Sequence, residues 1–132
     1  MYGFNITLND TFDNVITRVT EALKTEGFGI LTEIDVDGTF KKKLDVDIRP
    51  YRILGACNPK FAHKAITQEP DIGLLLPCNV VVREEENGSI CVGFMDPMSV
   101  MGLVQRPELE DLGKQVKEKL MRARDILEKS GA

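Results

Sequence analysis

Residues 52–82 read RILGACNPKFAHKAITQEPDIGLLLPCNVVV, and the other predicted elements are arranged around this segment. It contains two apolar runs, and each run leads into a cysteine followed by an asparagine, Cys57-Asn58 and Cys78-Asn79. A short apolar run that is bounded by turn residues is typical of a buried strand. We therefore predict a strand before each Cys-Asn pair and expect any functional site to lie near the two pairs.

The segment between the two pairs is predicted to be a helix. Asn58 suits the N-cap position, and Pro59 suits the first helical position, where its missing N–H group costs nothing. Apolar residues then recur at helical spacing in a narrow stripe from Phe61 to Ile66. Pro70 is predicted to end this helix, because proline has no N–H group to continue it.

The second strand is predicted to run from Ile72 to Arg83. Its residues are apolar on both faces, which predicts a central strand that is covered on both sides. Pro77 lies within this range and cannot donate a hydrogen bond to a neighbouring strand, so we expect a bulge or local break just before Cys78.

The rest of the chain alternates between the period of two that is typical of strands and the helical period of 3.6 residues. The predicted elements are a strand at 2–8, a helix that is capped by Asn9 and Asp10 and runs from Phe12 to a stop at Gly27, a strand at 28–36, a short helix around Phe40 and Leu44, a strand at 51–56, a strand at 90–95 after an Asn87-Gly88 turn, and a long helix opened by Pro107. This order predicts one α+β domain over residues 1–132, with a mostly antiparallel sheet and helices packed on one face.

Composition narrows the class of protein. The chain is 42% hydrophobic and 29% charged, which is ordinary for a soluble globular domain. It contains no apolar run of about 20 residues and no signal-peptide pattern, and three cysteines argue against a disulfide framework. A cytoplasmic location without membrane contact is therefore expected. The net charge of −4 disfavours nucleic acid as a partner.

The two cysteines of the Cys-Asn pairs have two interpretations. Cys57 directly precedes the predicted helix, whose free N–H groups would stabilise a thiolate and favour a thiol-dependent enzyme or a redox protein. The alternative is that Cys57 ends a buried strand as a small apolar side chain, as free cysteines usually do. Cys78 has the same two interpretations, because the break at Pro77 either re-aims its side chain or leaves it in the core.

Charged residues and possible metal ligands are less informative. Glu33 lies on an acidic strand face, and Lys43 ends a run of three lysines; together they form either a solvated edge or a polar cleft that faces a ligand. Zinc ligands normally come in closely spaced pairs, whereas the cysteines and His63 are single, so no metal site is predicted. The residue pattern contains no complete catalytic set and leaves the cofactor, if there is one, unknown.

Three blocks of sequence carry a resemblance to a known family. Residues 27–36 (GFGILTEIDV), 53–59 (ILGACNP) and 73–80 (GLLLPCNV) closely resemble the family named domain of unknown function 302, and the resemblance extends over nearly the whole chain. It implies a compact TBP-like α+β domain of bacterial or archaeal origin that is intracellular and forms a homodimer. It also implies that no activity is established for the family.

The resemblance marks individual positions of this chain, namely Glu33, Lys43, Gly55, Cys57, Asn58, Pro59, Pro77, Cys78 and Asn79. It suggests that Cys57 and Cys78 converge on one region. One position departs from the family pattern, because Asp45 stands where the family often has glycine. This departure leaves the turn after the short lysine helix an open question, although aspartate tolerates left-handed backbone better than most residues.

Three functions follow as alternatives. The first is a dimeric ligand-binding or sensing module, and its candidate site residues for a small-molecule ligand are Glu33, Lys43, Cys57, Asn58, Cys78 and Asn79. The second is a thiol-dependent enzyme or redox protein that uses Cys57 or Cys78. The third is an interaction module without a ligand. The apolar segment from Met98 to Val104 is suited to cover either a pocket or a partner subunit.

Overall fold

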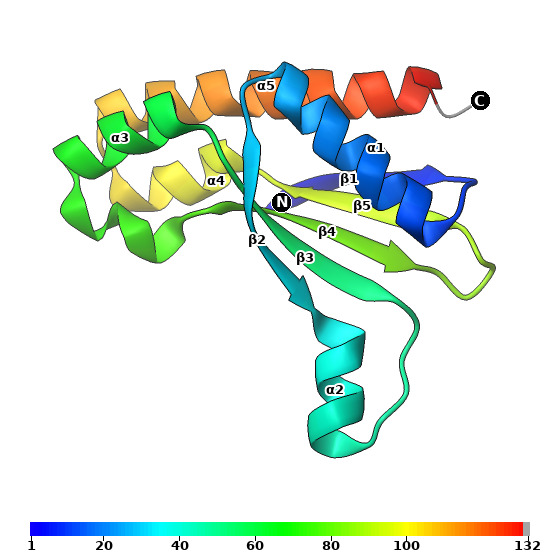
Figure 1. The fold of residues 1–132 in the computed structure, drawn as a ribbon. Coiled ribbons are helices and arrows are strands. Elements are labelled where there is room, and N and C mark those ends of the chain that lie inside the picture. The colour runs from blue at the N-terminus through cyan, green and yellow to red at the C-terminus, as the bar shows by residue number, and fades with distance from the viewer. Residues whose placement is uncertain (131–132) are drawn as a thin grey trace.

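The structure is a computed structural model that describes residues 1–130 (Figure 1). In chain order the elements are β1 (Gly3–Leu8), α1 (Phe12–Thr25), β2 (Gly29–Asp35), α2 (Val36–Leu44), β3 (Tyr51–Cys57), α3 (Pro59–Gln68), the 3-10 helix η1 (Pro70–Leu75), β4 (Cys78–Glu84), β5 (Ile90–Met95), α4 (Pro97–Met101), the 3-10 helix η2 (Gly102–Val104) and α5 (Pro107–Ser130).

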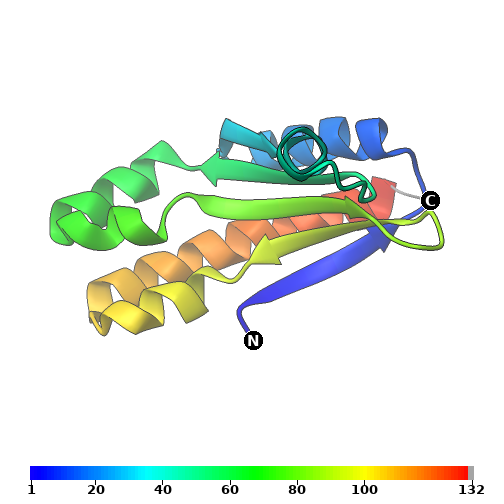
Figure 2. The same cartoon turned by 90° about the horizontal axis from the view of Figure 1, so that it is seen from below.

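The five strands form one sheet in the order β1-β5-β4-β3-β2, and every neighbouring pair is antiparallel. Helices α1 and α5 cover one face of this sheet, while α2 stands on the other side, beyond the ends of β2 and β3 (Figures 1 and 2). The predicted α+β class, with an antiparallel sheet and helices on one face, is confirmed. Helices α3 and α4 extend past the sheet and pack beside the first turns of α5.

The main core lies between the sheet and the two helices that cover it. The apolar stripe of α1 is buried there as its spacing predicts, because one side of a helix must face the sheet. The cap of α1 differs from the prediction: Thr11 Oγ1, rather than Asn9 or Asp10, accepts the hydrogen bond from the Asn14 N–H group at 3.2 Å. The Asp10 carboxylate instead accepts hydrogen bonds from the Thr11 N–H group and the Arg18 side chain.

The predicted strand from Ile72 to Arg83 is wrong in its first half. The apolar run up to Leu75 forms the 3-10 helix η1, and β4 begins only at Cys78. Pro70 opens the 3-10 helix, and Leu76 and Pro77 connect η1 to β4 outside any helix or strand. The local break that we predicted just before Cys78 is therefore confirmed.

Strand β4 lies at the centre of the sheet, as predicted. Helices cover only one of its two sides, so the prediction that both sides are covered is wrong. Val80 and Val82 are fully buried under the helices, whereas Asn79 is exposed and Val81 is half-buried on the opposite face. Helices α1 and α5 both lie on the same side of the sheet, and within residues 1–130 neither of them covers the face that carries Asn79.

The backbone departs from regular strand or helix geometry at two places near the family-matching segments. The pairing of β2 with β3 shifts register between Ile30 and Thr32, and this irregularity interrupts the expected alternation and leaves Leu31 exposed. Asp45 adopts the left-handed conformation (φ 55°) at the end of α2, so the turn is present although aspartate replaces glycine there.

Candidate functional site

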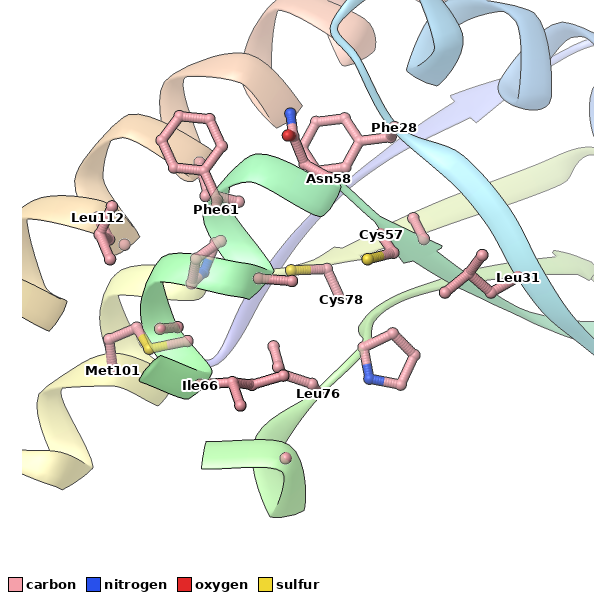
Figure 3. Close-up of a pocket in the computed structure, with 18 of the residues that line it drawn as sticks. Phe28, Leu31, Cys57, Asn58, Phe61, Ile66, Leu76, Cys78, Met101 and Leu112 are labelled. Carbon is pink, nitrogen blue, oxygen red and sulfur yellow. The ribbon is translucent and has the colours of Figure 1, made fainter. Parts of the chain in front are cut away.

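A cavity of about 320 Å³ lies where the ends of β2, β3 and β4 meet helices α3, α4 and α5 (Figure 3). Its lining is almost entirely apolar, and none of its lining residues is charged. The only polar side chains among them are Thr32, Asn58 and the two thiols, Cys57 and Cys78. The structure therefore places both cysteines and one asparagine at a hydrophobic hollow.

The cavity exists because two hydrophobic clusters meet there without filling the space between them. The first cluster is the core under the sheet and contributes Ala56 and Val116 to the lining. The second cluster lies among α3, α4, η1 and α5 and contributes Met101 and Leu112. Phe61 packs against both clusters and forms one wall.

The two thiols reach this cavity from neighbouring strands. Ala56 pairs with Cys78 across β3 and β4, so Cys57 is only one residue beyond the partner of Cys78. Both side chains lie at the same hollow in Figure 3. Cys78 is more than nine-tenths buried, and burial, reinforced by the nearby Cys57 thiol, raises the pKa of Cys78 to about 11. Cys78 is therefore a neutral thiol at physiological pH, whereas Cys57 is only half-buried.

Asn58 occupies the N-cap position of α3 as predicted, but its side chain does not cap the helix. Its amide Nδ2 instead donates a hydrogen bond to the backbone carbonyl of Glu26 at 3.2 Å. The same amide lies against Gly27, which has a φ of 86° and no room for a side chain. Asn58 thus ties the end of α1 to the wall of the cavity.

The other three candidate residues lie elsewhere. Glu33 is exposed on β2 and forms an ion pair with Arg52 at 3.1 Å. Lys43 is exposed on α2. Asn79 lies on the open face of the sheet, at a second hollow of about 480 Å³. The structure brings together Cys57, Asn58 and Cys78 but does not bring Glu33, Lys43 or Asn79 to the same cavity.

Several cavity residues were not among the sequence candidates. Phe28, Phe61 and Leu112 line the hollow but look like ordinary core residues in the sequence. Two signals pointed towards this region, namely the apolar stripe of α3 and the segment from Met98 to Val104. That segment contains the end of α4, and its Met101 lines the cavity.

The remaining side chains with metal-binding or nucleophilic chemistry lie outside the cavity. Cys91 is buried in β5, and its burial raises the pKa of its thiol. His63 is exposed on α3. Among residues 1–130, no group of three or more histidine, cysteine, aspartate or glutamate side chains is placed to hold a metal ion. Over the same residues, no helix is both long and apolar enough to span a bilayer.

Comparison with known proteins places this architecture in a family. The model of the domain of unknown function DUF302 matches residues 4–127. The chain belongs to the DUF302 family. The resemblance that the three sequence blocks suggested is thereby confirmed.

Two similar proteins show how far this DUF302 chain can be compared. A crystal structure of an uncharacterised conserved DUF302 protein from Bacillus stearothermophilus has a TM-score of 0.88 and 28% sequence identity, and the match covers 96% of this chain and 98% of that one. An uncharacterised protein of Aquifex aeolicus (strain VF5) is 30% identical over 80 residues. That match covers 58% of this chain and only 56% of the relative.

Proposed function

We propose that this DUF302 chain binds a small, uncharged and largely apolar molecule in the cavity at Cys57, Asn58 and Cys78. The observation that carries the proposal is the hollow of about 320 Å³ between the two hydrophobic clusters. Cavities that hold small molecules in proteins measure about 300–1,000 Å³ and combine apolar walls with a few polar groups. A charged ligand is disfavoured, because no lining residue would compensate the loss of its hydration.

The exposed part of the lining supports access to this cavity. Leu31 on β2 and Ile66 on α3 both line the hollow, and both are exposed to solvent. An apolar ligand would cover these side chains and remove hydrocarbon surface from water, which is the main driving force for binding of this kind. We place the entrance to the cavity between β2 and α3.

Replacing Ile66 with alanine should weaken the binding of n-octanol about 3- to 10-fold, because part of the apolar contact is lost. Alanine is also a good helix former, so α3 should be retained. Isothermal titration calorimetry measures the change. The matched control is Ile126→Ala on α5, since Ile126 is 39% exposed, close to the 45% of Ile66, but does not line the cavity. Absence of saturable n-octanol binding to the unmodified chain would contradict the proposed function.

We further propose that the protein forms a homodimer through a surface centred on α2. None of the nine residues of α2 is buried within one chain. The exposed apolar side chains on and beside this helix are Ile34, Phe40, Leu44, Val46 and Ile48. A helix this short depends on packing for its stability, and a second copy would supply that packing.

The dimer predicts that light scattering at micromolar concentration will give twice the mass of one chain. Leu44→Lys should shift the mass towards that of one chain, because it places a charge in the apolar surface. Leu103→Lys is the matched control, since Leu103 is 72% exposed, close to the 66% of Leu44, but lies in η2 and outside this surface. A monomer mass for the unmodified chain would exclude the dimer at that concentration.

A thiol-dependent activity is the second candidate function, and the different settings of the two cysteines favour it. Cys57 is half-buried at the cavity, whereas Cys78 remains protonated because of its raised pKa. Since the thiolate is the reactive form, Cys57 rather than Cys78 is the candidate nucleophile. Three unpaired thiols suit a reducing compartment such as the cytoplasm.

A further inference from the structure

We propose that Cys57 forms a covalent adduct with an apolar α,β-unsaturated carbonyl compound whose hydrocarbon tail fills the cavity. The inference rests on the proposed function, since it names the chemical class of the ligand that the cavity would take. It adds a bond between that ligand and one named sulfur atom.

The walls of the cavity are hydrocarbon, and only a few polar groups interrupt them. The nucleophilic side chains among the lining residues are Cys57, Cys78 and the hydroxyl of Thr32. Apart from the amide of Asn58, the rest of the lining is hydrocarbon. Neither thiol makes a hydrogen bond or ion pair with another side chain within residues 1–130, and both face the hollow in Figure 3. Cys78 belongs to the main core cluster, whereas Cys57 is only half-buried, so Cys57 is the more accessible of the two thiols at the cavity.

The lining of the cavity limits the reactions that a cysteine could carry out there. Hydrolysis or acyl transfer at a cysteine normally requires a neighbouring base and an oriented partner for that base. No histidine, carboxylate or amine lines this cavity. Conjugate addition requires only a thiolate and an electrophilic carbon, and cysteine is the side chain best suited to it. The electrophile must also be uncharged, because the walls offer no compensating charge.

The step balances without an oxidant or a reductant. The sulfur of the Cys57 thiolate forms a bond to the β-carbon of the ligand, and the electron pair of the C=C double bond moves onto the α-carbon and carbonyl oxygen. The resulting enolate takes a proton from water at the α-carbon. Overall, the thiol loses its S–H bond and the ligand gains one C–S bond and one C–H bond. Cys78 does not compete for the ligand, because its pKa of about 11 keeps it protonated.

The experiment uses a series of straight-chain methyl enones, namely pentenone, heptenone and nonenone, whose reactive ends are the same. Intact-mass spectrometry of the full chain over time gives the rate constant for addition, and peptide mapping locates the adduct. We expect one adduct per chain, at Cys57, with a rate constant that rises by up to about 10-fold for every two methylenes added. The rate constant with glutathione, which has no cavity, should change little along the series.

Variants and a competitor separate the possible outcomes. Cys57→Ser should abolish the adduct, whereas Cys91→Ala should retain it, because Cys91 does not line the cavity. Saturating n-octanol should slow the addition of nonenone. For each enone, the rate constant for labelling of Cys57 is divided by the rate constant with glutathione. If n-octanol binds but this ratio is no higher for nonenone than for pentenone, the covalent inference fails and the proposed binding function stands. If n-octanol does not bind at all, the proposed function fails. Mapping of the adduct in the unmodified chain to any residue other than Cys57 overturns the inference even if Cys57→Ser does not fold.

Discussion

Replacing Leu120 with alanine should lower the free energy of unfolding by about 2–5 kcal/mol. Leu120 is completely buried in α5, in the cluster that holds this helix against the sheet. Removal of its side chain takes away buried hydrocarbon and leaves a space that the surrounding sheet can only partly close. Domains of this size are stable by about 5–15 kcal/mol in total, so this single change should remove a large fraction of the stability.

Urea denaturation followed by circular dichroism measures this effect, with Leu74→Ala as the matched control. Leu74 is 86% exposed in η1, so the same truncation should change the free energy of unfolding by no more than about 0.5 kcal/mol. Equal effects of the two substitutions would show that α5 does not pack on the sheet as described.

Replacing Gly55 with alanine should lower the free energy of unfolding by about 1–3 kcal/mol, because the new methyl group has no space. A Cβ atom at Gly55 would collide with the Thr32 hydroxyl and would lie 2.8 Å from the Pro77 ring. Pro77 directly precedes Cys78 and lines the cavity, so movement of its ring should also weaken n-octanol binding. The family resemblance marks Gly55, and the close approach of Thr32 on β2 and of Pro77 to β3 explains why a glycine is needed there.

The matched control is Gly93→Ala in the neighbouring strand β5. A Cβ atom there would meet nothing within 4 Å, and alanine restricts the unfolded chain more than glycine does. We expect Gly93→Ala to be neutral or to raise the free energy of unfolding by up to about 1 kcal/mol. Thermal unfolding and calorimetric titration of both variants give the comparison. A Gly55→Ala variant as stable as Gly93→Ala, with unchanged n-octanol binding, would contradict the described packing of Thr32 and Pro77.

The thiol site could be located from the sequence only in part. Cys57 ends a largely buried strand and Asn58 follows it, and this local pattern was sufficient to place them just before the first turn of α3. That Cys78 shares their cavity depends on the antiparallel register of β3 and β4, which pairs Ala56 with Cys78. Asn79 has the same sequence neighbourhood as Asn58 but points to the open face, because successive side chains of a strand alternate between faces.

Elements whose periodicity is local could be predicted from the sequence alone. The buried stripe of α1, the long helix α5 and the Asn87-Gly88 hairpin were predicted correctly, because each depends on spacing within one segment. Tertiary packing was needed to show that the apolar run from Ile72 forms a 3-10 helix up to Leu75, and to give the shape of the cavity. A short apolar run is compatible with a strand or with a helical turn, and in η1 only Ile72 is buried whereas Leu74 is 86% exposed. The cavity is formed by residues from several helices and strands whose docking no single segment encodes.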